Sequence, residues 1–125
     1  MSVLTAFNDH FADFVNDIQT VFPDDVDILT AKNALIAIRK ANPKMIVKIW
    51  KTYIVDKYRT EIEANDISFF VDKDYSVDVS VSQNADKFME AIDRLRGPIK
   101  NMSLENQAKV MKYIRNLTKI SDLCE

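Results

Sequence analysis

Hydrophobic residues recur every three or four positions along most of this chain, which is the period of an amphipathic helix. The first stripe consists of Leu4, Phe7, Phe11, Phe14, Ile18 and Val21. It predicts a helix over residues 2–21 with Ser2 as its N-cap. The pair Phe22-Pro23 is expected to end it, because the residue before a proline avoids the helical region.

A second helix is predicted to begin near Asp25 or Asp27 and to run to Ala41. Its apolar stripe is Ile28, Ala31, Leu35 and Ile38. The pair Asn42-Pro43 then signals a new start, an N-cap residue followed by proline at the first helical position. The third helix is expected to run from there through residue 62. Its apolar face is broad, which is typical of a central helix.

Two further helices are predicted in the last third of the chain. One covers residues 84–96 and is closed by Gly97-Pro98, a glycine-then-proline stop signal. The other starts after the N-cap Ser103 and ends near Ser121. The residues expected to face inward are Ala85, Phe88, Ile92 and Leu95 in the first, and Leu104, Met111, Ile114, Leu117 and Ile120 in the second.

Residues 65–83 lack the helical period. Val77, Val79 and Val81 alternate with polar residues, which is a strand signal, but a lone strand has no pairing partner. We therefore expect an irregular segment with at most a short hairpin, in which Phe69-Phe70 either plugs the core or stands exposed as an anchor. The whole pattern predicts an all-α fold, a compact bundle of about five helices forming one domain over residues 1–125.

Composition narrows the functional classes. One glycine and three prolines are too few for a fold built on tight turns. The single cysteine, Cys124, has no partner for an internal disulfide, as is usual in a reducing compartment. No apolar run approaches the roughly 20 residues that span a bilayer, and Asp9 and Asp13 argue against a secretion signal. We expect a protein that is neither secreted nor membrane-spanning.

No pattern assembles a catalytic or metal site. His10 is the only histidine, so triads and histidine-rich metal sites lack partners, and a surface position is expected for it. The stretch 72–83 matches the first positions of a calcium loop, but Val77 replaces the turn glycine and Gln83 the bidentate glutamate. Phosphate-cradling loops need several glycines. We therefore expect no enzyme, no metal and no cofactor.

The net charge of −2 conceals alternating blocks. Residues 1–31 carry six aspartates and no lysine or arginine, and residues 32–59 carry eight basic residues against one acid. Residues 60–93 carry nine acids against two lysines, and residues 94–125 seven basic residues against three acids. Such blocks usually pair inside a fold, and one left unpaired would face a partner.

Two candidate binding faces follow from these blocks. Asp9, Asp13 and Asp17 line one face of the first helix, where like charges repel. Either basic residues elsewhere relieve them, with Lys44, Lys48 and Lys51 the nearest match in spacing, or the acidic face docks a basic partner. The candidate basic face consists of Lys44, Lys48, Lys51, Arg94, Arg96, Lys109, Lys112, Arg115 and Lys119. Basic faces neutralise phosphates, but the low net charge favours solvated or internally paired side chains.

Four stretches of the chain carry a resemblance. They are residues 42–50 (NPKMIVKIW), 66–75 (DISFFVDKDY), 92–106 (from IDRLR to NMSLEN) and 111–117 (MKYIRNL). Over roughly residues 7–121 the chain resembles a group of small uncharacterised proteins encoded by large nucleocytoplasmic DNA viruses of eukaryotes, the giant viruses. The resemblance implies a eukaryotic host and a place in the host cytoplasm, a viral factory or the virion. It carries no functional residues.

Together these observations favour a non-catalytic protein-interaction or virion-associated component. It would dock on a viral or host protein through charged helix faces. The alternative is a nucleic-acid-associated protein that uses the basic faces of the third and last helices and binds weakly. One continuous positive face would favour the alternative, and interleaved signs would favour protein docking. The oligomeric state is left open by the sequence.

Overall fold

The computed structural model describes residues 2–68 and 83–124, and this part of the chain contains helices and turns but no strand. The predicted all-α bundle is confirmed. The elements are α1 (Val3–Val21), α2 (Val26–Ala41), α3 (Met45–Trp50), the π-helix η1 (Lys51–Val55), α4 (Asp56–Glu63), α6 (Gln83–Lys100) and α7 (Leu104–Leu123). Because α3, η1 and α4 follow one another without a break, they form one bent helix.

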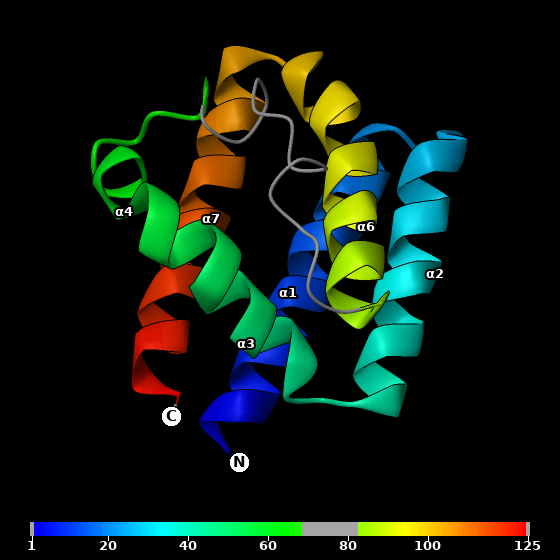
Figure 1. The fold of residues 1–125 in the computed structure, drawn as a ribbon. Coiled ribbons are helices and arrows are strands. Elements are labelled where there is room, and N and C mark those ends of the chain that lie inside the picture. Colours follow the sequence, from blue (N-terminus) through cyan, green and yellow to red (C-terminus); the bar gives the residue numbers. More distant parts are fainter. Residues whose placement is uncertain (1, 69–82, 125) are drawn as a thin grey trace.

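The bent helix contacts every other helix of the bundle. Helix α1 packs against α7 on one side and α2 on the other, and α2 packs against α6. The bent helix crosses this layer, with α3 contacting α1, α2 and α6, while η1 and α4 contact α7 (Figure 1). The central position predicted for the third helix is therefore confirmed. Both ends of the chain lie at the same end of the bundle.

Helix caps follow the sequence signals closely. The Ser2 hydroxyl accepts a hydrogen bond from the Thr5 backbone N–H at 3.0 Å. The Asp25 carboxylate accepts two, from the backbone N–H groups of Asp27 at 2.8 Å and Ile28 at 3.2 Å. The Ser103 hydroxyl likewise caps α7. Each cap satisfies donors that a helix start leaves without partners.

The prediction for the third helix is wrong in two details. It begins at Met45, because Asn42 and Pro43 form a turn in which the Asn42 side-chain oxygen accepts from the Lys44 backbone N–H at 3.1 Å. It is also not regular, since η1 inserts a wider turn and Tyr58 has non-helical angles of φ −125° and ψ 23°. Such π turns re-aim the side chains that follow them.

The expected stop at Gly97-Pro98 is also wrong, because α6 continues through both residues to Lys100. Gly97 explains this continuation. A residue before proline is kept out of the helical region by clashes that involve its Cβ, and glycine has none. Pro98 has no N–H to donate to the carbonyl four residues earlier, so α6 lacks one backbone hydrogen bond near its end. Gly97 does not adopt a positive φ.

The core is built around an aromatic cluster. Phe11 of α1 lies 5.6 Å from Trp50 of α3 and 5.8 Å from Phe88 of α6, measured between ring centroids. Phe7 and Phe14 flank it along α1. All five rings are almost completely buried. Three helices thus meet at one side chain, and edge-to-face ring packing adds to the apolar area that they bury.

The core prediction is wrong at two positions. Other expectations fall on residues that the structure does not describe. Leu104 is 85% exposed and Val21 38% exposed, because they stand at a helix start and a helix end where the packed face has run out. The expectations for Phe69, Phe70, the alternating valines at 77–81 and most of the calcium-like stretch fall on residues that the structure does not describe.

Replacement of Phe11 by alanine is expected to lower the free energy of unfolding by about 3–5 kcal/mol, because it removes a ring that three helices share. Chemical denaturation followed by circular dichroism measures this loss. The matched control is Val26→Ala, which truncates a side chain that is 74% exposed and should change the stability by less than about 0.5 kcal/mol. Equal losses in both variants would contradict the packing described.

Candidate functional site

The acidic stripe of α1 is largely satisfied within the chain, but not by the predicted partners. Asp9 forms an ion pair with Arg39 of α2 at 2.7 Å, and Asp17 accepts a hydrogen bond from the Tyr113 hydroxyl of α7. Among the described residues, no ion pair joins the stripe to the lysines at 44, 48 and 51. Those lysines instead line a groove whose other residues include Val3 and Leu4 at the start of α1 and Leu123 and Cys124 at the end of α7.

Lys44 directly before α3, Lys48 of α3 and Lys51 of η1 border a shallow groove of about 710 Å³ between the first turn of α1 and the end of α7. Lys51 donates a hydrogen bond to the Cys124 backbone carbonyl at 2.9 Å, so it closes this end of the bundle. Lys44 and Lys48 are exposed. Burial raises the pKa of the Cys124 thiol, which keeps it protonated and disfavours a nucleophilic role.

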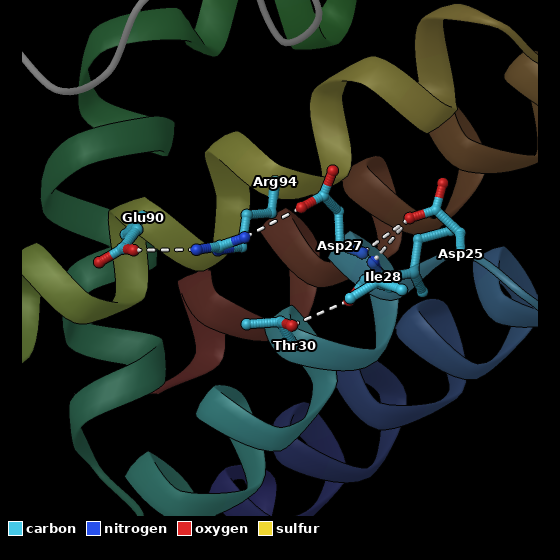
Figure 2. A network of polar contacts seen from close by, with 7 residues as sticks. Asp25, Asp27, Ile28, Thr30, Glu90 and Arg94 are labelled. Carbon is cyan, nitrogen blue, oxygen red and sulfur yellow. Dashed lines mark hydrogen bonds and ion pairs between the residues drawn. The ribbon is translucent and has the colours of Figure 1, made fainter.

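The arginines of α6 are engaged in ion pairs. Arg94 contacts Asp27 of α2 at 2.9 Å and Glu90 of its own helix at 3.4 Å. Figure 2 shows this network reaching the N-cap of α2, where Asp25 holds the first backbone N–H groups. Arg96 pairs with Asp93 at 3.2 Å. Their guanidinium groups therefore join helices or stabilise their own helix.

The basic residues of α7 do not extend the lysine groove into one face. Lys109 borders a small hollow shared with Asp17 and Tyr113. Lys112, Arg115 and Lys119 border a different hollow, in which Arg115 donates to the Asn65 side chain at 3.3 Å. Arg59 and Asp122 pair at 2.9 Å between α4 and α7. Positive and negative groups thus interleave over the described surface.

His10 is half-buried, so the surface position predicted from the sequence holds only in part. Its ring packs against Tyr113 at a tilt of 39° with centroids 4.9 Å apart, and its Nε2 atom is buried without a hydrogen-bond partner among the described residues. Tyr113 also contacts Phe14 at 5.5 Å. The three rings fasten α1 to α7, and no group of three or more His, Cys, Asp or Glu side chains in the described part could hold a metal ion.

The feature that sequence reasoning missed is a groove of about 480 Å³ between α1 and α2. Its floor is apolar, made by Phe11, Val15, Leu35 and Ile46. Two rows at a spacing of four residues form its walls. They are Asn8, Ala12 and Asn16 on α1, and Lys32, Ile36 and Lys40 on α2. The volume lies within the range of roughly 300–1,000 Å³ that ligand pockets occupy.

The two walls run antiparallel, which fixes which residues face each other. At one end Asn8 donates from its Nδ2 to the Pro43 carbonyl at 3.0 Å, and at the other end Lys32 donates to Gln19 at 3.0 Å. Asn8 therefore lies at the end of the groove that Lys40 borders. Ala12 leaves space at the centre, where Ile36 is 44% exposed.

One residue of the groove wall, Asn8, carries an orphan acceptor that is closed to solvent. Asn8 is only 3% exposed, and its Oδ1 atom has no hydrogen-bond partner among the described residues. A buried acceptor left without a donor costs about 1–3 kcal/mol, so such atoms are uncommon in proteins and often mark functional positions. No acidic residue lines the groove, and its rim carries Lys32, Arg39 and Lys40.

A sequence signal for this site exists in retrospect. A small and polar row at positions 8, 12 and 16 lies directly beside the apolar stripe of α1. Such a row on an otherwise buried helix flank leaves a trough when the neighbouring helix does not fill it.

In the described residues no helix has the length and apolarity required to cross a membrane.

Tyr113 gives the interface between α1 and α7 a testable signature. Burial, followed by the hydrogen bond to Asp17, raises the pKa of Tyr113 to about 12. The raised pKa means that the folded state favours the protonated hydroxyl of Tyr113. The stabilisation that this hydroxyl provides is therefore present below about pH 10 and is lost as the pH rises through about 12. An absorbance titration at alkaline pH should show one of the four tyrosines ionising late. Tyr113→Phe should remove that phase, and four tyrosines titrating together near pH 10 in the native protein would contradict the assignment.

No protein-family model, curated protein or solved structure matches this chain. The relationship to viral proteins therefore stays a prediction from the sequence, and the α1–α2 groove is interpreted from its own chemistry.

Proposed function

We propose that this chain is a non-catalytic protein-interaction domain that binds a segment of another protein in the α1–α2 groove. The observation that carries the proposal is the combination of an apolar floor, the exposed Ile36 and the buried, unpartnered Asn8 acceptor in one trough. Apolar troughs between two helices bind amphipathic helices through anchors at helical spacing. The proposed docking site is therefore a groove with a charged rim rather than the acidic stripe alone.

Nucleic-acid association is the second candidate, supported by the exposed Lys44 and Lys48 beside their groove. It ranks lower because Arg94 and Arg96 are held in ion pairs and the basic side chains of α7 border separate hollows. Phosphate binding requires several cations that face one backbone together. If the viral resemblance holds, the partner would be a viral or host protein in the host cytoplasm, a viral factory or the virion.

The protein-binding function is tested by selecting helical peptides from an unbiased display library. We expect binders whose affinity falls at least roughly tenfold when Ala12→Trp fills the centre of the groove, since the lost contacts amount to about 1.4 kcal/mol or more. Ala108→Trp is the matched control, because Ala108 is also an exposed helical alanine but lies on α7 outside the groove. Selection that yields no binder, or binders that both variants affect equally, would refute the function.

Duplex DNA binding is expected to be weak and salt-sensitive, with a dissociation constant no tighter than about 1 µM at physiological salt. Fluorescence anisotropy at two salt concentrations measures it. A Lys44→Ala and Lys48→Ala double variant should lower that affinity further, whereas sequence-specific binding in the nanomolar range would reverse the order of the two candidates.

A further inference from the structure

The two ends of the α1–α2 groove differ in chemistry. At one end lie the Asn8 acceptor and the cation of Lys40, and at the other end lies Lys32. Arg39 stands near Asn8, but its charge is compensated by Asp9 at 2.7 Å. Lys32 donates a hydrogen bond to the neutral side chain of Gln19 rather than to an acid, and Lys40 forms no ion pair among the described residues.

We propose that the groove binds an acidic amphipathic helix that inserts one tryptophan side chain beside Asn8, with carboxylates on Lys40 and Lys32. This inference rests on the proposed function and specifies the partner. The floor at Phe11 and Leu35 requires an apolar body, and the orphan Oδ1 atom requires a hydrogen-bond donor. The indole ring combines a large apolar surface with a single N–H donor and no acceptor.

Other anchor side chains satisfy fewer of these conditions. Phenylalanine and leucine leave the Asn8 oxygen without a donor. Lysine and arginine donate, but the rim at Lys32 and Lys40 repels them. Tyrosine donates as well, yet its oxygen brings lone pairs that an apolar floor leaves unpaired. The Asn8 oxygen is closed to solvent in this state, so the indole reaches it through a small displacement of the groove wall.

The acidic character of the partner follows from the spacing of the two lysines. Lys32 and Lys40 lie eight residues apart on α2, which corresponds to about 12 Å along the helix axis. A partner helix laid along the groove therefore presents one carboxylate next to its tryptophan and a second about two turns away. No acid lines the groove, so neither carboxylate meets a like charge among the lining residues.

Three competing occupants fit less well. A fatty acid at neutral pH carries a carboxylate for Lys40 but no donor for Asn8. A nucleic-acid backbone makes no use of an apolar floor. A second copy of this chain lacks the anchor, because its only tryptophan, Trp50, is fully buried in the core.

The test uses the intact protein and a designed helical peptide with one tryptophan and glutamates positioned one residue and two turns away from it. A second peptide replaces tryptophan by benzothienylalanine, which keeps the ring shape but has sulfur in place of the N–H group. Calorimetry measures both peptides against the native protein and against Asn8→Leu. We expect the replacement to weaken binding to the native protein roughly fivefold or more and binding to Asn8→Leu less than about twofold.

Charge reversal tests the acidic part and remains informative if Asn8→Leu does not fold. Lys40→Glu should weaken the tryptophan peptide roughly fivefold, and a peptide with lysine in place of the adjacent glutamate should recover most of that loss. Ala41→Glu supplies a matched control, since it introduces the same charge one residue further along α2 at an exposed alanine outside the lining.

The outcomes separate this inference from the proposed function. If benzothienylalanine weakens peptide binding to the native protein and to Asn8→Leu equally, the tryptophan helix is not the occupant. If the lysine peptide does not recover binding to Lys40→Glu, the partner is not acidic at that position, and the inference is likewise overturned. If the unbiased library still yields groove binders of other composition, the interaction function stands without it. Self-association of the chain that Ala12→Trp abolishes would identify a second copy as the occupant and would also overturn the inference.

Discussion

The packing of Phe11 is the interaction on which the rest of this structure depends. Its ring joins α1 to Trp50 of the bent helix and to Phe88 of α6, so three helices are positioned by one side chain. The same ring forms part of the floor of the α1–α2 groove. The geometry of the candidate site is therefore coupled to the core, and binding in the groove needs no separate scaffold.

The groove exists because one flank of α1 carries side chains too small or too polar to complete the core. Ala12 is the smallest of them, and Asn8 is buried by its neighbours without gaining a full set of hydrogen bonds. A bulky apolar residue at position 12 would fill the trough, and an apolar residue at position 8 would remove the unpaired acceptor. A packing gap and an unpaired acceptor thus coincide along this flank of α1, a combination that is typical of a binding site.

The charge blocks of the sequence are used mainly within the fold. Acids of residues 1–31 pair with basic residues from other blocks, as Asp9 does with Arg39 and Asp27 with Arg94. These pairs are partly exposed, so each contributes little to stability, and they join helices whose placement the core packing has already set. The other basic groups are spread over separate grooves. Lys32 and Lys40 border the same apolar floor, and this combination suits an acidic amphipathic partner.

The sequence by itself determined the helices, most of their caps and most of the buried stripe, because helical periodicity and capping are local properties. It misplaced the stop at Gly97-Pro98 and the start at Met45, where local signals were overridden by a glycine without Cβ and by a turn at Asn42. Only the tertiary structure decided which charges pair and where the groove lies. Ion pairs such as Asp9–Arg39, and the alignment of Asn8 with Lys40, depend on how two helices lie relative to each other. That relative placement is set by long-range packing of the core, which no spacing within a single helix encodes.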